Sequence, residues 1–489
     1  MATINSAFGI MTQALDADQA ALSIVANNVA NASTPGYTKE IPQWQEDAPV
    51  TINGAPYGQG VTETGPRSVR DRVLTERLDQ QQQLASASNA RLSALDTMQT
   101  LFTPDSGSTS ATAGDIGNDI TAFFSSFTTL EANPTNDADR QGVLSAAATL
   151  SSDISGAASS LNAQRSDLDQ EVAGIGGQVN SLTASIAQLN QQIQTSSPEA
   201  DAGTLEDQRE EDVSQLSNLI GINQITTENN GLSITTTSGD LLVSEGTSFQ
   251  MTNGTVDGIT HLFVGTKDIT SGLTGGGGEL GGDLTARDQD IPSSLASLDQ
   301  LAYGISTEVN AQNNAGIDMN GQAGGNIFSS SSAVTGSALT MSVKMTDANG
   351  VAAAGSGQGS GGNLNATALA NLGNVSNPPI LNGLTLSDGQ TLAAGQTLLN
   401  GQTPSDYFSS FVSSLGSTVS EVQTENTAQT ASVTQLQTQN DALSSVNLND
   451  EASAMSTLET SYQAAAKVFS ILSTVMTSAL NLGQETTVS

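Results

Sequence analysis

The C-terminal end of the chain carries the feature that most constrains its fold, an apolar pattern with helical spacing. Apolar side chains recur there at alternating steps of three and four residues, the spacing of a coiled-coil seam. These residues are Met455, Leu458, Tyr462, Ala465, Phe469, Leu472, Met476 and Ala479. A second apolar row beside the first consists of Ala464, Val468, Ile471, Val475 and Leu482. Because one partner helix cannot cover two rows, the pattern predicts a helix over 447–482 that is surrounded by several neighbours.

The N-terminal end shows the same three-four spacing and predicts a second long helix, over 5–30. Its seam, interrupted only by Asp18, consists of Ile4, Phe8, Met11, Leu15, Leu22, Val25 and Val29. We expect this helix to end before Pro35 and Gly36, because proline has no amide donor and glycine favours a turn. The two terminal helices can form an intramolecular antiparallel pair, or a pair that also packs against other subunits. The second apolar row of the C-terminal helix favours packing between subunits.

The charge of the chain argues against nucleic acids and anionic lipid surfaces as partners. Among its 489 residues, 49 are acidic and 13 are basic, which gives a net charge of −36. Binding to nucleic acids or to anionic membranes rests on Lys and Arg. The sequence shows no signal peptide and no apolar run of about 18 residues that could span a bilayer. It therefore predicts no membrane insertion, and either a cytosolic location or export by a route without a cleaved signal.

The arginines gather near the start of a helix predicted over 69–101. Arg67, Arg70, Arg72 and Arg77 lie there, with acidic residues between them. A single arginine in such a pattern usually belongs to a solvated helical ion pair of small energetic value. As a group, the four favour a patch that complements acidic surface between subunits.

No motif in the sequence predicts catalysis, a cofactor or a metal ion, and we expect a protein that is not an enzyme. His261 is the only histidine, so neither a two-histidine metal site nor the HExxH motif of metalloproteases can form. The chain has no cysteine and therefore no thiolate chemistry. The glycine-rich stretch 275–282 predicts a flexible segment, since it lacks the Lys-Ser/Thr of a phosphate-binding loop. Trp44 is expected to pack beneath the loop that follows it.

The segment 26–37, with the sequence ANNVANASTPGY, resembles the N-terminal signature of the bacterial flagellar axial proteins, which are the rod, hook and hook-associated proteins. The residues that carry this motif are Asn27, Asn28, Asn31, Pro35, Gly36 and Tyr37. The segments 446–452 and 462–467 resemble the C-terminal signature of the same family. The resemblance implies that the two terminal helices form the inner tube of a flagellum.

Three further segments, 58–61, 205–210 and 280–288, resemble the hook-associated members of that family, which join hook to filament. The segment 205–210 belongs to a long helical insertion, and ordinary hook and rod proteins lack an insertion of this kind. The resemblance implies a structural subunit of a homo-oligomeric ring or tube, in contact with hook subunits and a second junction protein. It also implies unfolded export through the flagellar secretion channel, with a chaperone at the C-terminal helix, and hence a location in the extracellular flagellum.

We expect the subunit interface to be formed by the apolar seams of both terminal helices. The expected interface residues are Ile4, Phe8, Met11, Leu15, Leu22, Val25, Val29, Met455, Leu458, Tyr462, Phe469, Leu472, Val475 and Met476. Two alternatives remain open at this point. One is a flagellar filament or hook subunit, and the other is an extracellular adhesin whose coiled coils form a stalk.

The predicted elements favour a mainly α fold with β-rich insertions (α+β), in which long coiled-coil helices from both termini pack together and β-rich domains lie outside. Residues 1–110 would form an N-terminal helical segment of the axial tube. Residues 111–325 would form a helical middle with a small β domain at about 222–270. Residues 326–403, rich in Gly and Ser, would form a β-like outer module with strands at 339–344 and 380–386. Residues 404–489 would form the C-terminal helical segment of the tube.

Overall fold

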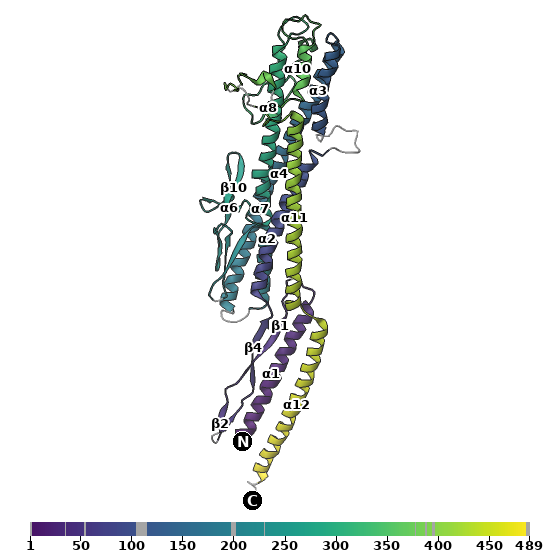
Figure 1. Cartoon of the computed structure of the whole chain (residues 1–489). Coiled ribbons are helices and arrows are strands. Elements are labelled where there is room, and N and C mark those ends of the chain that lie inside the picture. The colour runs from purple at the N-terminus through teal and green to yellow at the C-terminus, as the bar shows by residue number, and fades with distance from the viewer. Residues whose placement is uncertain are drawn as a thin grey trace.

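The computed structural model describes residues 2–34, 36–52, 55–103, 115–196, 202–228, 230–376, 378–386, 389–393 and 397–485. The molecule is elongated and mainly helical, and its two termini lie together at one end (Figure 1). Pro35 lies outside the described residues. The side chains of Ile4 and Leu482 also lie outside them.

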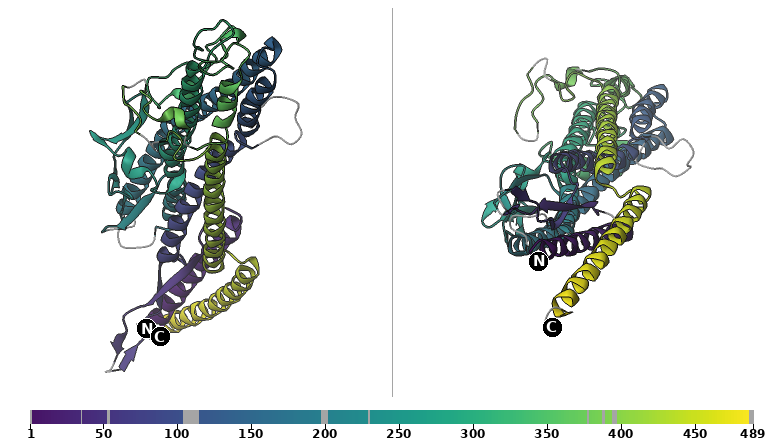
Figure 2. Two further views of the ribbon diagram at one scale, coloured as in Figure 1. Left: turned by 45° about the horizontal axis from the view of Figure 1, so that its top comes forward. Right: turned by 90° about the horizontal axis from the view of Figure 1, so that it is seen from below.

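The two terminal helices, α1 (Ala2–Asn31) and α12 (Leu448–Glu485), run antiparallel and lie side by side (Figures 1 and 2). The helices expected over 5–30 and 447–482 are thereby confirmed. The two seams face each other, and the ring centroids of Phe8 and Phe469 are 4.3 Å apart. The expectation that the long terminal helices pack together is also confirmed.

A narrow β ribbon follows α1 and lies against it. Its long arm pairs β1 (Glu40–Glu46) with β4 (Val61–Ser68), and its tip pairs β2 (Val50–Ile52) with β3 (Ala55–Tyr57), both antiparallel. The register shifts between Gln43 and Trp44, as at a β-bulge. Trp44 is 51% exposed, so the expectation that it packs beneath a loop is wrong. The reason is that a two-stranded ribbon has no second layer to cover its outer face.

Three long helices form the shaft of the molecule: α2 (Arg72–Thr100), α4 (Asp137–Ser196) and α11 (Pro404–Ser444) (Figure 1). Leu415, Val419 and Val422 of α11 are buried. Asn426 of α11 donates a hydrogen bond of 3.2 Å to the hydroxyl of Ser88 on α2. A bond between polar side chains at a helix contact favours one register of the two helices.

The far end of the shaft is completed by α3 (Ile116–Ala132), α8 (Ile291–Ala315) and α10 (Leu364–Leu372). A short π-helical segment, Ala286–Asp290, leads into α8. Phenylalanines fill the core here, and the ring of Phe123 lies 5.2–5.3 Å from those of Phe124, Phe127 and Phe328. Edge-to-face packing of this kind adds to the stabilisation from burial alone.

The β domain lies beside α4 and follows α5 (Thr204–Leu219). It contains two antiparallel sheets among the described residues, in the region where the sequence predicted a small β domain. The first sheet has the order β5 (Ile222–Thr226), β6 (Leu232–Thr236), β7 (Leu241–Ser244) and β8 (Thr247–Ser248). The second has the order β11 (Lys267–Asp268), β10 (Ile259–Val264) and β9 (Met251–Val256). The fully buried side chains of Ile234 and Leu262 pack in one core with those of α4.

The glycine-rich stretch at 275–282 is part of the packed core, so the prediction of a flexible segment is wrong. It follows α6 (Thr270–Leu273) and enters α7 (Gly278–Thr285), which packs against α2. A Cβ at Gly282 would lie 2.9 Å from the Cβ of Ala90 and would clash with the carbonyl oxygen of Ala87. The glycine is therefore required by the close approach of two helix backbones.

Residues 326–403 also differ from the prediction, because neither strand expected there forms among the described residues. The region contains α9 (Ser337–Thr340), two 3₁₀ turns (Ala348–Gly350 and Pro379–Leu381) and isolated bridges such as Phe328 to Val343. The small residues Val351, Ala352, Ala353 and Ala354 are fully buried. The backbone amide of Ala352 donates to the side-chain oxygen of Asn313 at 2.9 Å. Small residues let this segment pack closely on α8, which composition alone does not reveal. The domain boundaries of the sequence analysis stay predictions.

Candidate assembly surface and the joint behind it

The outer face of α12 is an apolar surface that no described residue covers. Its exposed fractions are 44% for Val468, 56% for Ile471, 47% for Val475 and 56% for Leu480. Tyr462 and Met476, which the sequence assigned to the first row, are each 37% exposed. A large aliphatic side chain left in water forgoes roughly 1.5–3 kcal/mol of burial. This row is therefore a candidate contact surface for another protein chain.

The inner face of α12 packs on α1, and the predicted seam residues divide between the two faces. Met455, Leu458, Phe469 and Leu472 are half-buried on the inner face. On α1, Phe8, Met11, Leu15 and Leu22 are half-buried, Val25 is buried and Val29 is 40% exposed. The sequence analysis missed Ala21 and Ile24 of α1, both buried. Ile24 lies one position away from the heptad seam. It is buried nevertheless, because α1 also packs against the β ribbon.

The motif residue Asn28 lies at the joint where the terminal helices meet the shaft. It is 1% exposed, and its side chain makes four hydrogen bonds. Its amide donates to the Glu40 carbonyl at 2.8 Å and to the Glu451 carboxylate at 3.0 Å. Its oxygen accepts from the Tyr37 hydroxyl at 2.8 Å and from the Glu40 backbone amide at 3.0 Å. Asn28 thus uses its full hydrogen-bonding capacity to tie α1, β1 and α12 together.

The other motif residues shape the turn that returns the chain to Asn28. The amide of Asn31 donates to the backbone carbonyl of Asn27 at 3.1 Å and to its side-chain oxygen at 2.9 Å. Gly36 has φ of +75°, a conformation that favours glycine. Burial, together with the nearby carboxylates of Glu40, Asp207 and Glu451, raises the pKa of Tyr37. The Tyr37 hydroxyl therefore stays protonated and donates to Asn28.

A salt bridge and a backbone bond fasten the start of α12 to the same joint. Lys39 Nζ lies 2.7 Å from Glu451 Oε1. The backbone amide of Lys39 donates to the carbonyl of Ser444, the last residue of α11, at 2.8 Å. Neither Lys39 nor Glu40 was singled out from the sequence. The charge of Glu451 inside an otherwise weakly charged stretch was the available signal.

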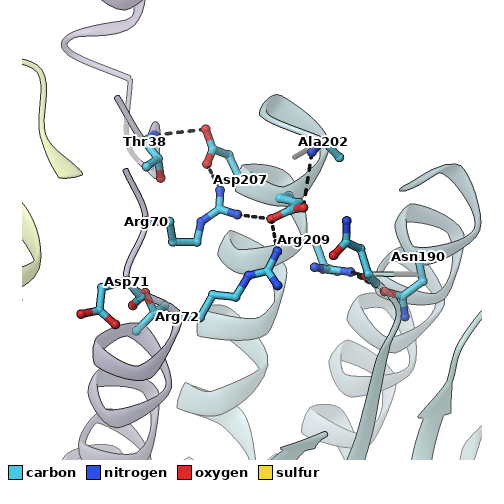
Figure 3. Close-up of polar contacts among 11 residues, drawn as sticks. Thr38, Arg70, Asp71, Arg72, Asn190, Ala202, Asp207 and Arg209 are labelled. Atoms are coloured by element: carbon cyan, nitrogen blue, oxygen red, sulfur yellow. Dashed lines mark hydrogen bonds and ion pairs between the residues drawn. The ribbon is translucent and has the colours of Figure 1, made fainter. Parts of the chain in front are cut away.

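Behind the joint, arginines from the link between β4 and α2 meet two acids of α5 (Figure 3). Arg70 forms an ion pair with Asp207 and another, of 2.6 Å, with Glu206. Arg72 reaches Glu206 at 3.0 Å. The backbone amide of Thr38 donates to Asp207 at 3.1 Å, so Asp207 bridges the joint and the shaft.

These ion pairs argue against the predicted arginine patch that complements acidic surface between subunits. Arg70 and Arg72 are neutralised within one chain, and the side chain of Arg70 is only 6% exposed. Arg67 and Arg77 are exposed and form no ion pair with the described residues.

Burial and the neighbouring charges together set the pKa values in this cluster. Burial tends to lower the pKa of Arg70, but Asp207, Glu210 and Glu206 outweigh it and raise that pKa. Burial raises the pKa of Glu210 and lowers that of Arg209. Arg209 donates to Asn190 at 2.9 Å instead of pairing with a carboxylate. These ion pairs and hydrogen bonds join the link before α2 to α5 within one chain. The cluster described here contains no nucleophile beside a base.

Comparisons with known proteins agree with this architecture. Residues 106–328 match the family described as the flagellar hook-associated protein FlgK helical domain, and residues 10–38 match the flagella basal body rod protein family. The chain is 26% identical over 332 residues to flagellar hook-associated protein 1 of Salmonella typhimurium, covering 65% of this chain and 58% of that protein. It is 25% identical over 525 residues to flagellar hook-associated protein 1 of Bacillus subtilis, covering 96% of each.

A solved structure shares the fold. The flagellar hook junction protein FlgK from Burkholderia pseudomallei aligns with a TM-score of 0.61 at 17% identity, over 76% of this chain and all of that one. The sequence and family matches, with the paired terminal helices, make this chain similar to flagellar axial proteins. Within that class, the similarity of this chain is to flagellar hook-associated protein 1. In the match to the Salmonella protein, it spans 58% of that relative's length.

Proposed function

We propose that this chain is a structural subunit of the bacterial flagellum that forms the junction between hook and filament, and that it has no enzymatic role. The observation that carries the proposal is the uncovered apolar row on α12, beside a face already occupied by α1. In a tube of such pairs, each outer row packs on a neighbouring copy. Burial of four half-exposed aliphatic side chains per subunit then adds up to several kcal/mol, at roughly 25 cal/mol per Å².

The proposal extends to partners and location. Hook subunits would contact one end of a ring of this chain, and a second junction protein would contact the other. The same apolar row of α12 would bind an export chaperone before assembly, because an exposed apolar surface promotes aggregation in the bacterial cell. The assembled protein would reside in the extracellular flagellum after export by the flagellar route. No helix in the described part of the chain is long and apolar enough to cross a membrane.

The decisive experiment deletes this protein from a flagellated strain, returns variants to the deletion strain, and images its flagella. Val475→Asp places a charge in the exposed row and should leave hooks without filaments. Ser470→Asp is the matched control, because Ser470 is exposed and lies roughly 140° around the helix from Val475 at about 100° per residue. Deletion of 473–489 should also abolish joining. Filaments of normal number in the Val475→Asp strain, with the variant present at normal level, would contradict the proposal.

A further inference from the structure

Three side chains at the joint form an arrangement that the proposed assembly role does not use. The two oxygens of the Glu451 carboxylate each hold a different nitrogen. Lys39 Nζ lies 2.7 Å from Oε1, and Asn28 Nδ2 donates to Oε2 at 3.0 Å. Glu451 is 2% exposed and Asn28 is 1% exposed. An amine and a primary amide are therefore held together on one buried carboxylate.

The side-chain carbonyl of Asn28 is polarised by two donors. Its Oδ1 accepts from the Tyr37 hydroxyl at 2.8 Å and from the Glu40 backbone amide at 3.0 Å. Two fixed donors on a carbonyl oxygen stabilise the negative charge that develops there when a nucleophile adds to the carbonyl carbon. The site thus has donors for that charge, and it has a carboxyl group in contact with the nitrogen that would leave.

The backbone of Lys39 is held on both sides, which keeps its amine at the site. Its amide donates to the Ser444 carbonyl at 2.8 Å, and its carbonyl accepts from the Val69 amide at 3.0 Å. The Lys39 side chain is only 24% exposed. An amide is unreactive toward a dilute amine, but fixing the two groups in contact replaces a high concentration of the amine.

We propose that the folded chain forms an amide bond between Lys39 Nζ and Asn28 Cγ, with release of the Asn28 amide nitrogen. Glu451 takes a proton from the Lys39 ammonium group, which frees the lone pair of Nζ. This pair forms the Nζ–Cγ bond, and the electron pair of the carbonyl moves onto Oδ1, where Tyr37 and Glu40 donate.

The second half of the reaction restores the carbonyl. In total, two protons pass from Nζ to Nδ2 through the Glu451 carboxylate. The Cγ–Nδ2 bond then breaks as the carbonyl reforms, and the nitrogen leaves as ammonium. The positive charge of Lys39 departs with it, Glu451 is unchanged, and no further reactant is needed.

The reaction requires the complete joint. Glu451 belongs to α12, so it meets the other two residues only after the two ends of the chain have come together. The new bond closes a loop over 28–39 and fixes the turn that leads from α1 to β1. It should therefore be absent from the unfolded chain. All its groups come from one chain, so the proposal does not depend on the assembly role.

Mass spectrometry of the full-length chain tests this proposal. Chain isolated in urea from inclusion bodies should have the full mass of its sequence, and after refolding it should lose the mass of one ammonia over days. Trypsin cleaves after Lys39 and Arg67, so the unreacted chain yields peptides 1–39 and 40–67. The reacted chain should yield a single peptide, 1–67, lighter by one ammonia, because trypsin does not cleave after an acylated lysine.

Variants separate the covalent bond from the contacts around it. Lys39→Arg can keep an ion pair with Glu451 but should show no conversion, since a guanidinium group stays protonated and is no nucleophile. Glu451→Gln should slow conversion at least about a hundredfold, as loss of a general base does. Asp450→Asn is the matched control, because Asp450 is the adjacent acid and is exposed, and it should convert at the natural rate.

Tyr37→Phe decides if Glu451→Gln does not fold, as judged by circular dichroism. It removes one of the two donors to Oδ1 and should slow conversion about a hundredfold. The aromatic ring stays in place in this variant, so its packing is kept.

Four results would overturn the proposal. The first is a refolded chain that keeps its full mass for weeks. The second is loss of ammonia while trypsin still cleaves after Lys39, which would mean a succinimide at Asn28. The third is loss of water with a peptide that joins Lys39 to the segment of Glu451, which would make Glu451 the acceptor. The fourth is equal slowing in Asp450→Asn and Glu451→Gln.

Discussion

The side-chain amide of Asn28 donates to the carboxylate of Glu451 at 3.0 Å, across 423 positions of sequence. This bond joins the last turn of α1 to the first turn of α12, at the point where both helices leave the shaft (Figure 1). Glu451 is 2% exposed, and Lys39 balances its charge. The orientation of the terminal pair therefore depends on a few buried polar contacts as well as on apolar packing.

We predict that Asn28→Ala loosens this joint. The change leaves the buried Glu451 oxygen and the Glu40 backbone groups without their partner, at a cost of about 2–4 kcal/mol. Hydrogen exchange should show faster opening around 28–40 and 446–455, with α4 unchanged. Asn27→Ala is the control, because Asn27 is exposed and its side chain makes only a local 2.9 Å bond with Asn31 and a 3.5 Å contact with the Tyr37 hydroxyl. Equal exchange in the two variants would mean that apolar packing alone sets the joint.

The ion pairs of Arg70 with Glu206 and Asp207 of α5 give a second prediction. Arg70→Met leaves Glu206 and Asp207 buried without their main counter-charge, which should destabilise the chain by about 3–5 kcal/mol in urea unfolding. Arg77→Met removes an exposed arginine of the same helix region and should change stability by less than about 1 kcal/mol. Similar losses in both variants would show that net charge, and not the buried pairs, sets the effect.

Packing of α7 on α2 gives a third prediction. Gly282→Ala should destabilise by about 1–3 kcal/mol, because the new methyl group meets Ala87 and Ala90. Gly142→Ala in α4 is the control, since a Cβ there has no neighbouring atom within 4 Å. That control should stabilise the helix by up to about 1 kcal/mol through backbone entropy. Thermal unfolding measures both, and opposite signs are expected.

The contrast between these elements explains what the sequence could predict. Helical spacing predicts amphipathic helices at both ends of the chain, so α1 and α12 and their approximate bounds were predictable. The burial of Val351–Ala354 and the packing of α7 were not, because both depend on close backbone approach between small residues, which composition reads as flexibility.

The contacts at the joint could not be predicted from the sequence, for a different reason. The motif Asn27–Tyr37 was visible as a pattern, but its partners Glu40 and Glu451 come from two other segments. Single-sequence periodicity carries no information on such distant pairs. The same limit led to the assignment of Arg70 and Arg72 to a contact between subunits.

The buried acid Glu308 on α8 gives a prediction on pH. Burial raises its pKa to about 8, above its value in the unfolded chain, and the side chain is 3% exposed. The folded state thus holds a proton that the unfolded state releases. The stability that this proton contributes is present below about pH 4.5 and is lost as pH rises through about 8.

Glu308→Gln should remove this loss. The free energy of unfolding of the variant should fall less steeply between pH 5 and pH 8 than that of the natural chain, by at most about 1.4 kcal/mol per pH unit. Glu459→Gln, an exposed acid on α12, should leave the slope unchanged. Urea titrations at four pH values measure the slopes, and parallel curves for the Glu308 variant would contradict the assignment.

The terminal pair gives the last prediction, on the free and assembled states. In the free subunit, α12 is held by the joint at Glu451 and by the Phe8–Phe469 contact, while its outer row faces water. A helix with few neighbours is only marginally stable, so its protection against hydrogen exchange should decline from 451 toward 485. Polymerisation should raise protection most strongly at Val468, Ile471 and Val475, whose side chains the neighbouring copy would cover. The centre of α4, fully packed within one chain, is the internal control and should not change. A monomer in which 468–485 is already as protected as α4 would show that the outer row needs no neighbour, and the polymerisation mechanism would fail with it.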